Sequence, residues 1–266
     1  DGEPLTGAVY ALSGVFSDSA GAVQTRTLAF GDGSSLSVGH LLAGETYTLV
    51  EQVAPAGHVC VGAELSFSID EAGRAVLAEG ADASLLTLTG DGRGLVVHDR
   101  PTELTLEKVD ASDPTKTLAG AVFELVDVAT GEKTDLAVDV DGRLTLRGVL
   151  SVGVSYTLRE AEAPEGYELD GTVFAFSLAS DGTLVAQDAG GYRVGADGVS
   201  IVLADEELGV DLEKVGSDGE PLTGAVYALS GVFSDSDGEA ETRTLAFGGG
   251  SSLSVGHLLA GETYTL

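Results

Sequence analysis

Three ionisable residues fall on the apolar face of predicted strands, where a charge is costly. In a strand, residues i, i+2 and i+4 share one face. A lysine, a glutamate and an aspartate each follow alternating apolar residues on such a face: Lys108 in LTLEKV (104–109), Glu160 in SYTLRE (155–160) and Asp205 in VSIVLAD (199–205). Together they offer an amine nucleophile, a carboxylic acid that can relay protons and a carboxyl electrophile. These types of residue are the components of an amide-forming reaction.

The same pattern recurs elsewhere in the chain. Glu51 follows Tyr47 and Leu49, Asp99 follows Leu95 and Val97, and Lys214 follows Val210 and Leu212, each on one face. Only four lysines are present, and two of them occupy this position. For any single residue, a buried salt bridge or a charge that leaves the core at the strand end is the alternative, because isolated buried charges are expensive. The recurrence of the trio favours a chemical role.

Four segments of the chain form a recognisable set: LEKVD (106–110), LAGAVFEL (118–125), YTLREAEAPEGY (156–167) and IVLAD (201–205). They resemble the Cna B-type (SpaA-type pilin) domains of Gram-positive surface proteins. The third matches the family's E-box, YxLxExxAPxGY, at every fixed position, and YTLVEQVAPAGH (47–58) keeps it with His58 in place of the last tyrosine. The resemblance implies tandem immunoglobulin-like (Cna B-type, prealbumin-like) β-sandwiches with an intramolecular isopeptide bond between the first and last strands.

The resemblance also implies a role for each residue. Lys108 is then the amine, Glu160 the catalytic acid and Asp205 the acceptor, in a variant that loses water where an Asn acceptor loses ammonia. Glu51 is the equivalent catalytic residue, and Asp99 and Lys214 are unpaired equivalents. Burial disfavours the charged forms of lysine and of carboxyl groups, which prepares all three for reaction. The event is a single turnover, so we expect no enzyme, no cofactor and no metal.

Short alternating segments with Asp-Gly or Ala-Gly turns dominate the chain and predict an all-β fold. No stretch keeps a 3.6-residue apolar period long enough for a substantial helix. Asp139-Val-Asp141-Gly is similar to the start of a calcium loop but lacks the later ligands, so a hairpin turn is expected there. Cys60 and His58 share a face, but no third group supports a thiol–imidazole pair, and a filler cysteine on a strand is the simpler interpretation.

Internal repeats divide the chain. Residues 1–49 and 218–266 align without gaps, with 44 of 49 positions identical. We expect a module at 1–100 that lacks its first strand, a complete module at 101–206, and the N-terminal part of a third at 207–266. The short junctions predict a rod. No lysine lies in residues 1–100, so the amine for Asp99 is expected before residue 1 or, alternatively, from the Lys214 strand of a neighbouring molecule.

Composition excludes several classes of function. The net charge of −30 argues against a nucleic-acid partner or an anionic membrane. No apolar run approaches the roughly 20 residues of a membrane span, and the first residues do not resemble a signal peptide. The single cysteine cannot form a disulfide within the chain. The missing leader and Met suggest an excerpt of a longer protein.

The repeats and the resemblance predict a structural stalk of an extracellular, cell-wall-attached Gram-positive adhesin or pilin-like protein. Its partners would be the neighbouring modules of the same chain and a host ligand at an unseen tip. The alternative is an adhesin module that itself binds host matrix or glycan, which an exposed aromatic or apolar patch would favour. A hydrolase has no supporting nucleophile–base pair.

Overall fold

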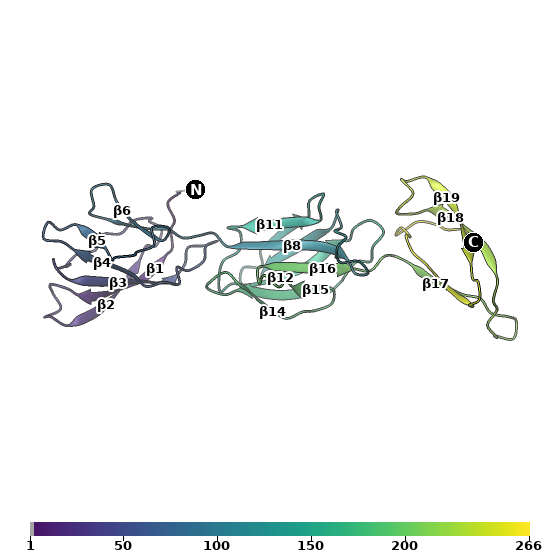
Figure 1. Cartoon of the computed structure of the whole chain (residues 1–266), viewed down its shortest axis with the longest axis horizontal. Helices are drawn as coiled ribbons and strands as arrows, with labels where there is room; N and C mark the ends of the chain where they lie inside the picture. Colours follow the sequence, from purple (N-terminus) through teal and green to yellow (C-terminus); the bar gives the residue numbers. More distant parts are fainter. Residues whose placement is uncertain (1–2) are drawn as a thin grey trace.

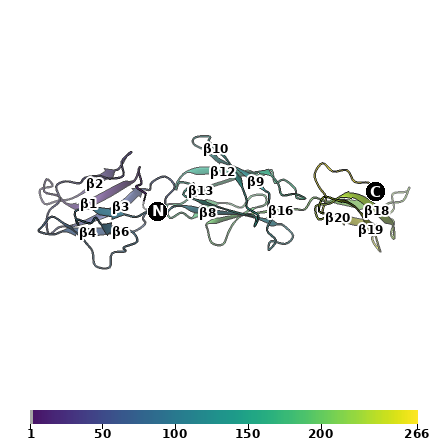
Figure 2. The ribbon, with the colours of Figure 1, turned by 90° about the horizontal axis from the view of Figure 1, so that it is seen from above.

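The chain forms strands that gather in three successive groups. A computed structural model describes residues 3–266, and none of these belongs to a helix. The groups follow one another along the long axis, and a perpendicular view shows the same row (Figures 1 and 2). We call them the N-terminal group (β1–β7), the central sandwich (β8–β16) and the C-terminal group (β17–β20). The prediction of an all-β fold is confirmed.

The N-terminal group contains one large sheet and one separate strand pair. The large sheet has the order β2-β1-β3-β4-β5, and β6 pairs only with β7. Alternate residues of β1 and β3, such as Tyr10, Leu12, Tyr47 and Leu49, fill the core of this group. The strands are β1 (Val9–Val15), β2 (Val23–Ala29), β3 (Thr46–Val53), β4 (Leu65–Ile69), β5 (Ala75–Leu77), β6 (Leu86–Leu88) and β7 (Leu95–Val97).

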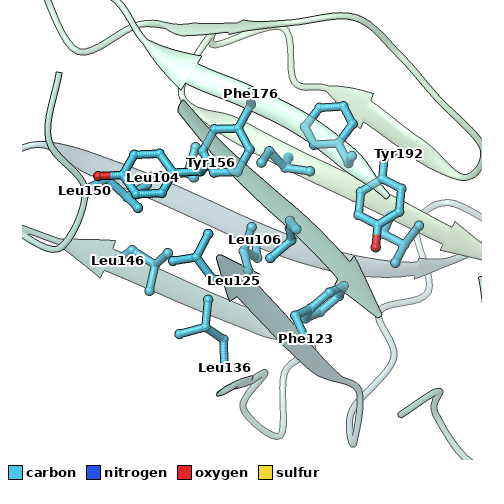
Figure 3. Close-up of a cluster of buried hydrophobic side chains, with 14 of the residues drawn as sticks. Leu104, Leu106, Phe123, Leu125, Leu136, Leu146, Leu150, Tyr156, Phe176 and Tyr192 are labelled. Atoms are coloured by element: carbon cyan, nitrogen blue, oxygen red, sulfur yellow. The ribbon is translucent and has the colours of Figure 1, made fainter. Parts of the chain in front are cut away.

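The central sandwich packs two sheets face to face, in the orders β10-β9-β12-β13-β14 and β11-β8-β16-β15. Its first strand, β8, lies beside its last strand, β16, and the two are parallel. Leu104 and Leu106 of β8 share one apolar core with Phe123 and Leu125 of β9 (Figure 3). The strands are β8 (Glu103–Asp110), β9 (Val122–Asp127), β10 (Lys133–Ala137), β11 (Arg143–Arg147), β12 (Ser155–Glu162), β13 (Phe174–Leu178), β14 (Leu184–Ala186), β15 (Tyr192–Val194) and β16 (Ser200–Asp205).

The C-terminal group consists of two strand pairs around a small core. β17 (Val210–Glu213) pairs with β20 (Ser252–Val255), and β18 (Val226–Val232) pairs with β19 (Ala240–Ala246). Leu229, Phe233, Leu245 and Val255 are its buried apolar residues. This core is much smaller than that of the central sandwich.

Glycines close the predicted turns. The second residue of each Asp-Gly or Ala-Gly turn has a φ between 69° and 86°, a conformation that glycine adopts without steric cost: Gly73, Gly92, Gly142, Gly182 and Gly198. The turn at Asp139–Gly142 is not a hairpin, however. β10 pairs with β9 and β11 pairs with β8, so this turn moves the chain from one sheet to the other.

Both junctions between groups use the same backbone hydrogen bond. The Thr102 amide donates to the Gly57 carbonyl at 2.8 Å, and the Leu208 amide donates to the Gly166 carbonyl at 2.8 Å. Gly57 and Gly166 are equivalent positions of the two E-box segments. The buried Thr102 hydroxyl also donates to the Leu150 carbonyl at 2.6 Å. These bonds restrict rotation between neighbouring groups.

Candidate cross-linking site

Adjacent strands of one sheet bring Lys108 and Asp205 together. Because β8 and β16 run parallel, with Lys108 opposite Leu203 and Asp205 opposite Asp110, the two side chains lie diagonally on the core face. Lys108 Nζ is in direct contact with Asp205 Oδ1. Lys108 is 0% exposed and Asp205 is 2% exposed. The neighbouring Glu206 is exposed.

The opposite sheet supplies the third residue. Glu160, on β12, is 1% exposed, and its Oε1 lies 3.5 Å from Lys108 Nζ. Its other oxygen, Oε2, accepts a hydrogen bond of 2.9 Å from the Asp170 amide. The carboxyl is thus held by one oxygen while the other faces the lysine and the aspartate.

Burial dominates the electrostatics of both carboxyls. It raises the pKa of Glu160 to about 7, because an ionised carboxylate would lose its hydration in the core. The nearby Lys108 acts in the opposite direction, and Asp205 adds to the rise. Burial also raises the pKa of Asp205, against hydrogen bonding and charge attraction from Lys108. Both groups are therefore easier to protonate than ordinary surface carboxyls.

Within residues 3–266, the facing atoms of these three side chains have no hydrogen-bond partner of normal geometry. This holds for Lys108 Nζ, Glu160 Oε1 and both carboxyl oxygens of Asp205. Buried polar atoms in folded proteins are nearly always hydrogen-bonded, so each exception needs an explanation. An amine, an acid and a carboxyl that face one another in a buried apolar core can condense to an amide.

A second Lys–Asp pair lies at the edge of the same domain. Lys116 Nζ lies 3.2 Å from Asp110 Oδ2, and the Tyr167 hydroxyl donates to that oxygen at 2.9 Å. Ser112 donates to Asp110 Oδ1 from its amide at 2.8 Å and from its hydroxyl at 2.7 Å. Although burial acts to raise it, these hydrogen bonds hold the pKa of Asp110 well below its usual range. Sequence reasoning missed this cluster, although Tyr167 is the last residue of the E-box.

The N-terminal group contains equivalents of two of the three residues of this site, Glu51 and Asp99. Glu51 is 8% exposed, and its Oε2 accepts a 2.5 Å hydrogen bond from the Val61 amide, as Glu160 does from Asp170. Burial raises the pKa of Glu51 and also that of Asp99. Glu51 Oε1 and Asp99 Oδ1 are buried without a hydrogen-bond partner among the described residues. The two acidic residues are present there, but Lys214 is not near them.

Lys214 lies in the C-terminal group, directly after β17. It is half-buried, and its Nζ lies 5.9 Å from the centre of the Tyr227 ring. Within the described residues it forms no ion pair, in contrast to Lys108. The structure therefore brings together Lys108, Glu160 and Asp205, and it separates Lys214 from Glu51 and Asp99.

The other candidate residues form no site. Cys60 lies in an extended segment outside the strands, where its amide donates to the Ser180 carbonyl at 2.9 Å, so its expected place on a strand was wrong. The Asp139 carboxylate accepts bonds from the amides of Asp141 and Arg143 within the turn. Residues 3–266 contain no group of three His, Cys, Asp or Glu side chains arranged to hold a metal.

A protein-family model matches most of the central sandwich. Residues 102–190, which include Lys108 and Glu160, match the family model described as SpaA, prealbumin-like fold domain. The central sandwich is a SpaA prealbumin-like domain. The resemblance seen in its sequence motifs is thereby confirmed for this domain, and so is the prealbumin-like fold.

Solved structures show weaker similarity over longer stretches. The C-terminal fragment of the pilus adhesin SpaC from Lactobacillus rhamnosus GG is 22% identical, with 76% of this chain and 89% of that chain covered and a TM-score of 0.42. The Bacillus anthracis TIE protein is 20% identical over 98% of this chain and 42% of that one, with a TM-score of 0.43. The shaft pilin SpaA from L. rhamnosus GG is 18% identical over 78% and 90%, with a TM-score of 0.29.

No curated protein matches the chain. Within residues 3–266 there is no helix with the length and apolar character needed to cross a membrane.

Proposed function

We propose that the SpaA prealbumin-like domain cross-links itself through an amide between Lys108 and Asp205, with Glu160 as the proton relay. The observation that supports this most strongly is the contact of Lys108 Nζ with the Asp205 carboxyl in a core that holds all three side chains at 2% exposure or less. The complete module is taken as residues 101–206, between an N-terminal module at 1–100 and part of a third at 207–266.

The reaction is a condensation whose atoms balance. The neutral amine of Lys108 attacks the Asp205 carboxyl carbon, while protonated Glu160 donates a hydrogen bond to the carboxyl oxygen. Glu160 then transfers the amine proton to the departing oxygen, so a C–N bond forms, a C–O bond breaks and one water leaves. Holding the groups in contact replaces a bimolecular encounter, which can contribute up to about 7–11 kcal/mol. The module is consumed in this step and does not turn over.

We infer that the chain acts as a stalk in an extracellular, cell-wall-attached adhesin or pilin-like protein of a Gram-positive cell. Pilins and pilus adhesins are the proteins that the similar structures name. A row of hydrogen-bonded strand groups suits a spacer, and the near-identity of residues 1–49 and 218–266 favours a role in which length matters. An amide bond also replaces the disulfide that a chain with one cysteine cannot form.

The mass of the intact, denatured chain tests the cross-link. We expect the purified protein to be lighter than its sequence by one water from the central sandwich. Lys108→Ala and Glu160→Ala should each restore the full mass expected for the variant and lower the Tm. By the chain-entropy model for loops of about 100 residues, the loss of the cross-link costs about 4.7 kcal/mol.

Two matched variants serve as controls. Lys133→Ala removes an exposed lysine, and Glu51→Ala removes the equivalent glutamate of the N-terminal group; both should retain the loss of water in the central sandwich. Recovery of Glu160→Ala protein that still lacks this water would refute the role assigned to Glu160.

A further inference from the structure

The loop that follows the E-box contains an aspartate that bonds to two distant parts of the chain. The Asp170 amide donates to Glu160 Oε2 at 2.9 Å. The carboxylate of the same residue accepts a bond of 2.7 Å from the Gly191 amide at Oδ2 and one of 2.8 Å from the Thr172 amide at Oδ1. The residue is half-buried. Its backbone therefore holds the catalytic glutamate while its side chain holds the bend before β15.

These bonds continue to the residue beside the acceptor. The Gly191 carbonyl accepts a bond of 3.2 Å from the amide of Ala204, which directly precedes Asp205. Glu160 belongs to β12 in one sheet, and Asp205 belongs to β16 in the other. A path of three hydrogen bonds thus runs from the acid across the sandwich to the acceptor strand, and Asp170 lies in the middle of it.

Close packing at the bend before β15 depends on two glycines. A Cβ at Gly191 would lie 2.5 Å from the Ala204 carbonyl oxygen and 2.9 Å from Asp170 Oδ2. A Cβ at Gly190 would lie 2.9 Å from the same carboxylate oxygen and 2.2 Å from Thr172 Oγ1. Side chains are excluded at such distances, so glycine is what allows the backbone to reach the carboxylate.

The Asp170 carboxyl has the charge that this arrangement requires. Although burial acts to raise it, hydrogen bonds from Thr172 and Gly191 hold the pKa of Asp170 below its usual value, and the charge of Lys108 acts in the same direction. An ionised carboxylate accepts hydrogen bonds at both oxygens and donates none, so each oxygen can receive one amide. An asparagine at this position would turn an NH₂ group toward one of these two donors.

A second copy of the same local sequence shows that the bridge is not a property of the turn. Asp-Gly-Thr occurs at 170–172 and again at 181–183. Asp181 also accepts a bond from the amide two residues further on, that of Thr183, at 2.9 Å. It is exposed, however, and among the described residues its carboxylate bonds only within its own turn. The contact with a distant segment is specific to Asp170.

The N-terminal group holds its glutamate without such a bridge. Val61 lies ten residues after Glu51, and its amide donates to Glu51 Oε2 at 2.5 Å. Asp170 likewise lies ten residues after Glu160. A valine side chain accepts no hydrogen bond. The amide contact is therefore common to both groups, whereas the link to the acceptor strand depends on the carboxylate.

We propose that Asp170 is a positioning residue of the cross-linking site. Its carboxylate joins the loop that holds Glu160 to the bend beside β16, and this fixes the distance between the acid and the Asp205 acceptor. Glu160 Oε1 is thereby kept directed at Lys108. This role rests on the proposed function and deepens it, because it adds a residue that takes no part in proton transfer.

The rate at which water is lost tests the proposal. In chain refolded from inclusion bodies, the intact mass at successive times gives the rate of cross-linking in the central sandwich. Asp170→Asn and Asp170→Val should each slow it by roughly 10–100-fold, because a misplacement of about 1 Å can cost about a hundredfold in rate. Asp181→Asn removes the aspartate of the matched turn and should cross-link at the unmodified rate. Equal rates in the Asp170 and Asp181 variants would overturn the proposal.

Hydrogen exchange separates positioning from a loss of overall stability. The Lys108→Ala chain cannot cross-link, so its amides report the hydrogen bonds alone. In that chain the amides of Asp170 and Gly191 should be protected, and adding Asp170→Asn should remove protection at both positions while β8 and β12 keep theirs. A uniform loss over all strands would show a merely structural role and contradict positioning. Rapid exchange at both amides in Lys108→Ala itself would do so as well, without any variant of Asp170.

The unmodified chain distinguishes this proposal from the proposed function. If it lacks one water and the Asp170 variants cross-link at its rate, only the role of Asp170 fails. If the unmodified chain keeps its full sequence mass, the proposed function fails as well.

Discussion

Hydrogen bonding distinguishes two buried carboxyls of the central sandwich that each lie beside a lysine. Asp110 accepts bonds from Ser112, Tyr167 and Lys116, and these keep it ionised. A carboxylate is a poor electrophile, so its contact with Lys116 stays a salt bridge. Asp205 is as well buried but lacks such donors, and burial raises its pKa. For the proposed cross-link, proximity to a lysine would therefore have to be combined with burial and a lack of hydrogen-bond donors.

The pH dependence of cross-linking should follow Glu160. Burial raises the pKa of Glu160 to about 7, so the acid is protonated below that pH and ionised above it. Since the protonated form assists the attack, loss of the Glu160 proton should slow the reaction as the pH rises through 7. Mass spectrometry of chain refolded from inclusion bodies at pH 5–9 measures this rate. A Glu51→Gln variant should show the same profile for the central sandwich, and a rate that rises through pH 7–9 would contradict the role of Glu160.

Replacing the acceptor by its amide should give the same product. In Asp205→Asn, attack by Lys108 expels ammonia where the natural side chain expels water, and the resulting amide is chemically identical. The mature variant should therefore have the same intact mass as the mature parent chain. Asp110→Asn is the control, because that residue is not an acceptor and the variant should differ in mass by the substitution itself. A mature Asp205→Asn chain at its full sequence mass would exclude Asp205 as the acceptor.

The alternation of residues predicted the buried faces of the site but not its hydrogen bonds. Lys108, Glu160 and Asp205 could be assigned to the core because strand parity is a local property. The Asp170 amide that holds Glu160 lies ten residues further along the chain, and its position depends on how the following loop packs. The cluster of Asp110, Lys116 and Tyr167 likewise depends on tertiary contacts between distant segments.

At the scale of elements, a strand depends on its neighbour as well as on its own residues. SLSV is a strand at Ser252–Val255 and not at Ser35–Val38, although the sequence is the same. No local propensity can distinguish the two copies, because the difference lies in the pairing with β17. The turn at Asp139–Gly142 was misjudged for a related reason, since turn residues do not reveal whether the next strand joins the same sheet.

The junction between the first two groups depends on a close approach of backbones. Gly57 has a φ of 74°, and a Cβ placed on it would lie 2.3 Å from the Gly148 carbonyl oxygen. Gly57→Ala should therefore lower stability by about 1–2 kcal/mol through strain and also loosen the junction. Small-angle X-ray scattering should show a more flexible chain.

A second glycine provides the matched control. Gly153 has a φ of 73°, and no atom lies within 4 Å of the position of its Cβ. Gly153→Ala should show the strain in thermal unfolding but leave the scattering profile unchanged. Equal scattering from both variants would show that the approach of Gly57 to Gly148 does not stiffen the junction.

For the whole molecule, the position of the proposed cross-link would determine how the chain responds to pulling. Force applied to the chain ends enters the central sandwich through β8 and leaves through β16 (Figure 1). With Lys108 joined to Asp205, 97 residues apart, the segment between them bears no load. Single-molecule stretching should lack an unfolding step of roughly 300 Å, which is the extended length of that segment.

Two variants, Glu160→Ala and Glu51→Ala, test whether the amide bears the load. The step of roughly 300 Å should appear in Glu160→Ala, where the bond cannot form, and stay absent in Glu51→Ala. A step of that length in the unmodified chain would show that the load crosses the sandwich without the amide.

The equivalent hydrogen bonds at Gly57 and Gly166 bear on the symmetry of longer arrays. Units that follow one another by a single fixed rotation and translation trace a screw, with a definite pitch and hand. Each further repeat of 217 residues would then turn the far end by a constant angle as well as raise it. The number of repeats in such a protein would set the rotation of its last unit about the long axis. Two stalks of different length would therefore present different sides to the same neighbouring surface.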